Sequence, residues 1–147
     1  MKLVDANVLI YAVNRADPKH DRSRQWLDRA LSGNETVGFA WLAVLAFVRL
    51  STRAGLFPRP LAVGDAVAVV RAWLGQPISV LLAPTPRHLD LLAGLLVGGG
   101  TGGNLVSDAH LAALALERDA TVVTFDHGFS RFSGVRTETP IPGGTEW

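Results

Sequence analysis

Three aspartates that lie far apart in the chain could together hold a metal ion. Asp5 lies in the opening run MKLVDANVLIYAVN, Asp108 follows GGNLVS, and Asp126 ends the run ATVVTFD. Burying an ionised Asp without a partner is costly, so Asp5 must meet a cation, cap a helix or lie at an open edge. Carboxylates that come close together raise each other's pKa unless a cation neutralises them. A small set of such oxygen ligands suits Mg²⁺ or Mn²⁺.

Each aspartate also has an ordinary structural role. Asp5 could cap the helix that follows it, Asp108 suits the first turn of a helix, and Asp126 could form a turn with Gly128. For any one of them alone, the structural role is the favoured interpretation. A metal site is the better interpretation only if all three reach the same edge of the fold.

The order of strands and helices decides where the aspartates lie. Predicted strands cover residues 2–4, 35–41, 78–84, 120–126 and part of 135–147, and predicted helices cover 7–14, 20–33, 42–55, 62–77, 86–100 and 107–118. Strands that alternate with helices form a parallel sheet covered on both faces. We therefore predict an α/β fold, a three-layer α/β/α sandwich with a central, mostly parallel sheet.

In open sheets of this kind, ligands bind beyond the carboxyl ends of the strands. Asp5 and Asp126 each end a predicted strand, and Asp108 opens a helix that starts near the same edge. We therefore expect the three carboxylates to converge there, which favours the metal site over three separate structural roles.

Four further residues are candidates for the same site. Asn7 and Thr124 stand two residues from Asp5 and Asp126, where they could hold a carboxylate or cap the local backbone. Arg49 and Arg53 have i,i+4 spacing, so they would share a helix face and could contact a phosphate backbone. Taken singly, each arginine is better explained as solvated surface.

Composition and charge limit the remaining possibilities. The 147 residues are 48% hydrophobic and carry a net charge of +1, which fits one domain, residues 1–147, without a strong basic field. We expect residues 140–147 to form a loose tail. The apolar run 37–50 is shorter than the roughly 18 to 20 residues of a membrane span, and the start of the chain lacks the pattern of a signal peptide. We therefore expect a cytoplasmic protein without a membrane anchor.

Three segments resemble a known family. The runs LVDANVLIYA, VLAFVRLST and SDAHLAALALERDATVVTFDHGF are similar to the PIN domain, and specifically to the VapC toxins of bacterial toxin–antitoxin pairs. The resemblance implies a Mg²⁺- or Mn²⁺-dependent ribonuclease that is inhibited by a VapB-type antitoxin and is usually a homodimer. It also implies that Asp5, Asp108 and Asp126 are the metal-binding acids, and we expect Asp126 to orient the attacking water.

The sequence departs from the family pattern at one position. Where the family usually has a glutamate in the middle helix, LAFVR places Ala46, followed by Arg49. Three acids more naturally hold one ion than two. Glu35 is a possible substitute for the missing acid, whereas Glu117 is half a turn out of phase with Asp108 and should face away.

Two other protein classes also place acids at strand ends. A phosphoaspartate domain needs a late lysine to neutralise its phosphate, and this sequence has no lysine after Lys19. A PIN-fold module that binds RNA or protein without cleaving is favoured by Ala46. The three aspartates argue against that alternative, because a protein that only binds gains nothing from three carboxylates that repel one another.

Overall fold

The computed structural model describes residues 1–98 and 103–142, and within them five strands form one sheet. The strands are β1 (Lys2–Val4), β2 (Val37–Ala40), β3 (Ser79–Leu82), β4 (Thr121–Val123) and β5 (Arg136–Glu138). Their order is β3-β2-β1-β4-β5, and every neighbouring pair is parallel. The predicted parallel sheet is confirmed, with β1 at its centre.

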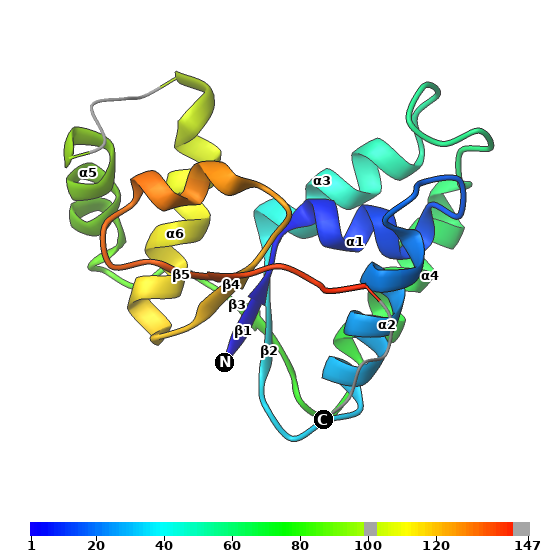
Figure 1. Ribbon diagram of the computed structural model, residues 1–147, viewed down its shortest axis with the longest axis horizontal. Helices are drawn as coiled ribbons and strands as arrows, with labels where there is room; N and C mark the ends of the chain where they lie inside the picture. The colour runs from blue at the N-terminus through cyan, green and yellow to red at the C-terminus, as the bar shows by residue number, and fades with distance from the viewer. Residues whose placement is uncertain (99–102, 143–147) are drawn as a thin grey trace.

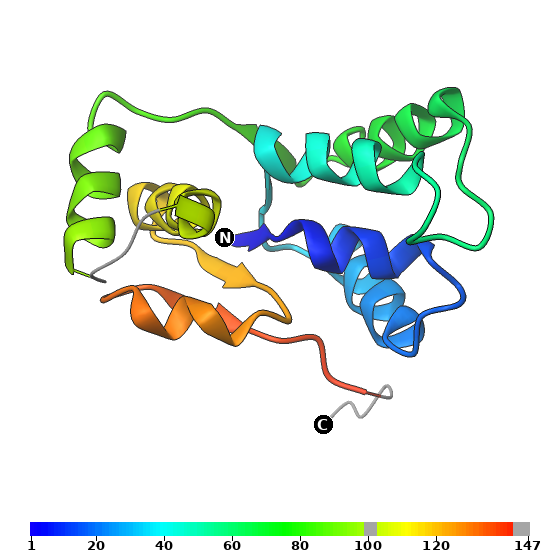
Figure 2. The ribbon, with the colours of Figure 1, turned by 90° about the horizontal axis from the view of Figure 1, so that it is seen from above.

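Helices cover both faces of this sheet (Figures 1 and 2). One layer holds α1 (Ala6–Val13), α2 (His20–Leu31), α3 (Trp41–Ser51) and α4 (Val63–Leu74), which pack against one another in the pairs α1–α2, α1–α3 and α3–α4. The other layer holds α5 (His88–Gly98) and α6 (Val106–Arg118), with the short helices η1 (Gly103–Leu105) and η2 (His127–Arg131). This is the predicted three-layer sandwich.

The core lies between the central strands of the sheet and the helices that pack against them. Leu3 and Val4 of β1 are fully buried, as are Val122 and Val123 of β4. On α6 the buried residues are mainly small, and Ala109, Ala112, Ala113 and Ala115 let this helix approach the sheet. The first residues of α6 are therefore held at a fixed position beside the ends of β1 and β4.

The last core strand is shorter than its apolar pattern indicates. The predicted strand 120–126 ends at Val123. The Thr124 amide still donates to the Glu138 carbonyl of β5 at 2.9 Å, but the next two amides donate to side chains. The Phe125 amide donates to Asn7 Oδ1 at 3.3 Å and the Asp126 amide donates to Thr124 Oγ1 at 2.9 Å. Asp126 therefore stands on a turn three residues beyond the strand.

The predicted tail, residues 140–147, lies partly outside the described residues, which end at 142. Among the helices that are described, none has the length and apolar character needed to cross a membrane.

Candidate active site

The strand order reverses direction between β1 and β4, and the three predicted acids lie at this point. Asp5 follows β1 directly, and its amide donates to the Val123 carbonyl of β4 at 2.9 Å. Asp126 follows β4, and Asp108 lies in the first turn of α6. Such a reversal leaves an open crevice at the carboxyl ends of the two strands, which is where α/β proteins bind ligands.

Asp5 combines a structural and an electrostatic role. Its Oδ1 accepts a hydrogen bond from the Ala6 amide at 2.7 Å and caps α1, while its Oδ2 accepts from Thr124 Oγ1 at 2.7 Å. Burial raises the pKa of Asp5 above its ordinary value, more than these hydrogen bonds lower it, and the charge of Asp126 raises it further. The carboxylate is thus held in place but is not neutralised.

Asp108 is the most strongly perturbed acid of the described residues. Burial, followed by repulsion from Asp126 and Asp5, raises the pKa of Asp108 to about 6. The interaction between the Asp108 and Asp126 side chains adds to this increase. A cation bound near both carboxyl groups would offset their repulsion.

Thr124 and Asn7 connect the carboxylates to one another. The buried Thr124 hydroxyl donates to Asp5 and accepts from the Asp126 amide, so one side chain holds the Asp5 carboxylate and the Asp126 backbone in place. Asn7 Nδ2 donates to Thr124 Oγ1 at 3.2 Å and lies 3.5 Å from Asp5 Oδ2. The geometry matches a supporting role for both residues, and that role stays a prediction.

The acids open into a cleft of about 220 Å³. Asp5 and Asp108 line it together with Ala6, Leu42, Ala43, Ala46, Arg49, Ser107 and Leu111. The missing glutamate would have stood at Ala46, so the small side chain leaves space in the cleft. Arg49 contributes the one cationic side chain among the residues that line it.

The donor set fits a hard divalent cation. All of the candidate ligand atoms are carboxylate oxygens, and among the described residues none of the three aspartates forms an ion pair with a cationic side chain. In the same part of the chain, no three Asp, Glu, His or Cys side chains stand ready to hold an ion as they are.

Two sequence predictions about nearby residues are wrong. Arg53 does not share a helix face with Arg49, because α3 ends at Ser51, and it does not line the cleft. Glu35 does not replace the missing acid. It lies just before β2, where its carboxylate pairs with the Met1 ammonium at 3.0 Å, at the opposite end of β1 from Asp5.

Glu117 faces away from the aspartates, as its helical phase indicates, and belongs to a network that sequence reasoning missed. Its side chain is 1% exposed and lies 3.0 Å from His88 Nδ1, while it also accepts from Thr85. His88 Nε2 in turn lies 2.9 Å from His110 Nδ1. Burial raises the pKa of Glu117, but hydrogen bonds from Thr85 and His88 outweigh it and leave the pKa lowered. The network joins α5 to α6.

Arg131 is a second residue that sequence reasoning missed. Its Nε donates to the Gly128 carbonyl at 2.9 Å, and its charge lowers the pKa of Asp108 against the larger effect of burial. Gly128 itself donates to Asp126 Oδ1 at 2.7 Å, and a Cβ at Gly128 would lie only 3.0 Å from that oxygen. The only signal in the sequence is the proximity of Arg131 to Asp126.

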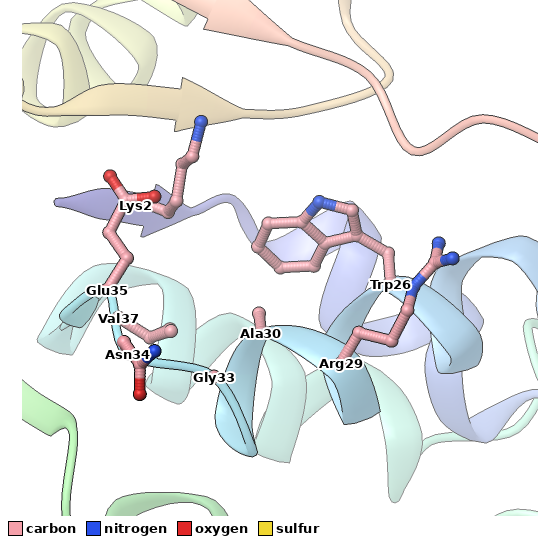
Figure 3. A pocket seen from close by; sticks show the side chains of 8 residues that line it. All are labelled: Lys2, Trp26, Arg29, Ala30, Gly33, Asn34, Glu35 and Val37. Atoms are coloured by element: carbon pink, nitrogen blue, oxygen red, sulfur yellow. The ribbon is translucent and has the colours of Figure 1, made fainter. Parts of the chain in front are cut away.

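A second pocket, of about 280 Å³, lies where β1 and β2 begin; we call it the Trp26 pocket (Figure 3). Lys2 and Glu35 line one side, and the Trp26 indole and Arg29 line the other. Glu138 joins the two sides, because its carboxylate accepts from Lys2 Nζ at 2.6 Å and from Trp26 Nε1 at 2.8 Å. Its acids are already paired, so this pocket lacks the features of a catalytic site.

The chain is similar to known proteins over most of its length. The model of the PIN domain family matches residues 2–135. The chain is 57% identical to Ribonuclease VapC37 of Mycobacterium tuberculosis over 140 residues, 95% of this chain and 97% of that protein, and 38% identical to Ribonuclease VapC33 of the same species over 96% and 99%.

Solved structures share the fold at low sequence identity. The VapBC2 structure from Rickettsia felis, bound to a DNA fragment from its promoter, matches with a TM-score of 0.69 and 18% identity over 94% of this chain and 97% of that one. Mycobacterium tuberculosis VapC20, described as a toxin that cleaves the sarcin-ricin loop, matches with a TM-score of 0.68 and 18% identity over 92% and 99%. The match of the family model and the identity to the two ribonucleases show that this chain belongs to the PIN domain family and, within it, to the VapC group.

Proposed function

We propose that this chain is an endoribonuclease toxin that hydrolyses RNA with Mg²⁺ or Mn²⁺ held by Asp5, Asp108 and Asp126. The observation that carries the proposal is the convergence of three carboxylates, without cationic partners in the described chain, at the point where the strand order reverses. The names of the ribonuclease relatives support RNA as the substrate. The described residues offer one such cluster of unneutralised acids.

Each side chain has a separate role in this proposal. Asp5, fixed by Thr124 and Ala6, and Asp108, at the start of α6, would hold the ion together with Asp126. A bound divalent ion supplies charge stabilisation at the phosphate oxygens and lowers the pKa of the attacking water. Asp126 is exposed on its turn, where it can orient that water and accept its proton.

Arg49 contributes positive charge on the opposite side of the cleft. Its guanidinium lines the same space as Asp5 and Asp108, and no carboxylate pairs with it among the described residues. A guanidinium can bind a phosphate through two parallel hydrogen bonds. With Ala46 in place of a fourth acid, we infer that the site holds one ion and that Arg49 binds the phosphate.

The partners follow from the same family membership. Structures of related chains are VapBC complexes, which supports a VapB-type antitoxin as the inhibitor of this chain and a cytoplasmic place of action. A homodimer is the assembly that we propose for the toxin itself. Sedimentation of the purified protein, alone and mixed with its antitoxin, tests both.

A second candidate function is an RNA- or protein-binding module with weakened or lost catalysis, and Ala46 in the cleft is the observation that favours it. The deciding experiment is cleavage of total cellular RNA by the antitoxin-free protein with Mg²⁺ or Mn²⁺, beside EDTA and an Asp5→Asn variant. Cleavage that both controls abolish establishes the nuclease. Folded protein that cleaves nothing and takes up no metal in a calorimetric titration establishes the binding module.

A further inference from the structure

Beside the acid cluster, two adjacent aromatic rings lie between two cationic side chains. Lys19 Nζ lies 5.3 Å from the centroid of the Tyr11 ring, and the Arg22 guanidinium carbon lies 4.9 Å from the centroid of the Phe125 ring. The two rings meet edge to face, with centroids 5.3 Å apart and an interplanar angle of 68°. We call Lys19, Tyr11, Phe125 and Arg22 the cation–aromatic row.

The row adjoins the catalytic cluster at Phe125. Phe125 stands between Thr124 and Asp126, and its amide donates to Asn7 Oδ1 at 3.3 Å. Tyr11 lies four residues after Asn7 on α1, so both side chains occupy the same helix face. From Phe125, the row therefore extends to Tyr11 of α1 on one side and to Arg22 of α2 on the other.

The two cations of the row have no carboxylate partner in the described part of the chain. None of the ion pairs there includes Lys19 or Arg22. Asp17 lies close by, because its Oδ1 accepts from the Lys19 backbone amide at 2.8 Å, and burial together with the smaller effect of the Asp17 charge raises the pKa of Tyr11. Both cations are half-buried and are held by the rings instead. A guanidinium stacked on a ring keeps a fixed plane, with its N–H groups and outer face available to a ligand.

We propose that the cation–aromatic row binds the nucleotide that flanks the scissile phosphate in single-stranded RNA. The inference rests on the proposed function and deepens it, because it names the subsite that orients the substrate. Single-stranded RNA is bound by stacking on aromatic rings or guanidinium planes together with cations along its backbone, and the row offers both. The acid cluster repels phosphates, so cations beside it are needed to bring the backbone in.

Arg22→Ala tests the row, and Arg24→Ala is its matched control. Arg24 is exposed on the same helix, carries the same charge and has no contact with the row. The measurement is fluorescence anisotropy of a labelled single-stranded RNA of about ten nucleotides, within the usual site size, in EDTA so that no cleavage occurs. Phe125→Leu tests the ring with the cation still present.

We expect Arg22→Ala to weaken RNA binding about tenfold, the effect of losing one stacked contact, and to lower the slope of binding against salt by about one. Phe125→Leu should weaken binding to a similar extent, and Arg24→Ala less than about twofold. In cleavage assays, kcat/KM of Arg22→Ala should fall mainly through KM. Thermal melts of each variant verify the fold.

Equal losses in Arg22→Ala and Arg24→Ala would mean that net charge alone matters, which overturns the row. Unchanged RNA binding with lost antitoxin binding would assign the row to a protein interface and would also contradict its role in RNA binding.

The experiments distinguish failure of the proposed nuclease activity from failure of the proposed RNA-binding row. If the wild-type chain cleaves nothing with Mg²⁺ but binds RNA through Arg22, the proposed nuclease activity is wrong and the proposed role of the row stands. If Arg22→Ala and Phe125→Leu cleave RNA with an ordinary KM, the nuclease activity stands and the role of the row is wrong.

Discussion

The two ends of β1 carry acids in opposite electrostatic situations. At the start of the strand, around the Trp26 pocket, Glu35 pairs with the Met1 ammonium and Glu138 with Lys2. The hydrogen bond from the ammonium, with smaller opposing burial, lowers the pKa of Glu35. At the end of the strand, burial and repulsion raise the pKa values of Asp5 and Asp108. Acids that stabilise the fold are paired, and acids that are left unpaired indicate a ligand.

The largest expected effect is that of Asp5→Asn on RNA cleavage. Asn caps helices as well as Asp does, so the fold is preserved while the charge that holds the ion is removed. We expect the rate to fall by more than about 100-fold, beyond the 10–100-fold typical of supporting residues. Glu35→Gln is the matched control at the other end of the strand and should cleave at the wild-type rate. Equal rates for the two variants would contradict a functional difference between the two ends.

Thr124→Val should have the next largest effect on cleavage. The substitution keeps the volume but removes the hydroxyl that donates to Asp5 and accepts from the Asp126 amide. We expect cleavage to fall about 10–100-fold, as for other residues that orient metal ligands. Thr124→Ser restores the hydroxyl and should recover most of the rate, measured by the same assay. A Thr124→Val enzyme with full activity would remove Thr124 from the site.

The metal-free protein should gain stability as the pH falls from 7 towards 5. The folded-state pKa of Asp108, about 6, lies above its ordinary value of 3.8, so the folded state binds a proton more readily than the unfolded state. Asp108→Asn removes this cost at pH 7, and we expect its Tm in EDTA to rise by about 2–4 °C, the shift that about 1 kcal/mol causes in a domain of this size. The gain is modest because Asp108 is only half-buried.

The difference in Tm between Asp108→Asn and wild type isolates this group from the other titrations. It should shrink as the pH falls through 6 and disappear at about pH 3, below both pKa values, where Asp108 is protonated in both states. Saturating Mg²⁺ should reverse its sign at pH 7, because only the wild type binds the ion well. A difference in Tm that is independent of pH would mean that burial and the neighbouring acids do not raise the pKa of Asp108.

Glu35→Gln should have the smallest effect. Its ion pair with the Met1 ammonium is exposed, so its loss costs less than about 1 kcal/mol. Because the folded-state pKa of Glu35 is lowered, this contribution is present above its ordinary pKa of 4.5 and is lost as the pH falls further. Urea unfolding at pH 7 and pH 4 measures it. A larger loss at pH 4 than at pH 7 would contradict the pairing.

The sequence was enough to place those site residues whose position follows from the start or end of a strand or helix. Asp5 and Asp126 could be placed at one edge because each follows a strand, and the helical phase of Glu117 was enough to turn it away. Glu35 was misjudged because its partner is the chain's own ammonium, which only the fold brings near. Arg131 and the cation–aromatic row were missed because their partners come from different elements. The network of Glu117, His88 and His110 joins two helices for the same reason.

The central position of β1 also sets when the enzyme can become active during its own synthesis. Asp5 is synthesised well before Thr124, to which it is tied across 119 positions of sequence, and β1 gains β4 as a neighbour only when residues 121–123 have emerged from the ribosome. Contacts between such distant parts of a chain form late in folding. A nascent or truncated chain that ends before β4 therefore carries the first aspartate without the rest of the site, and the toxin stays inactive until translation has passed β4.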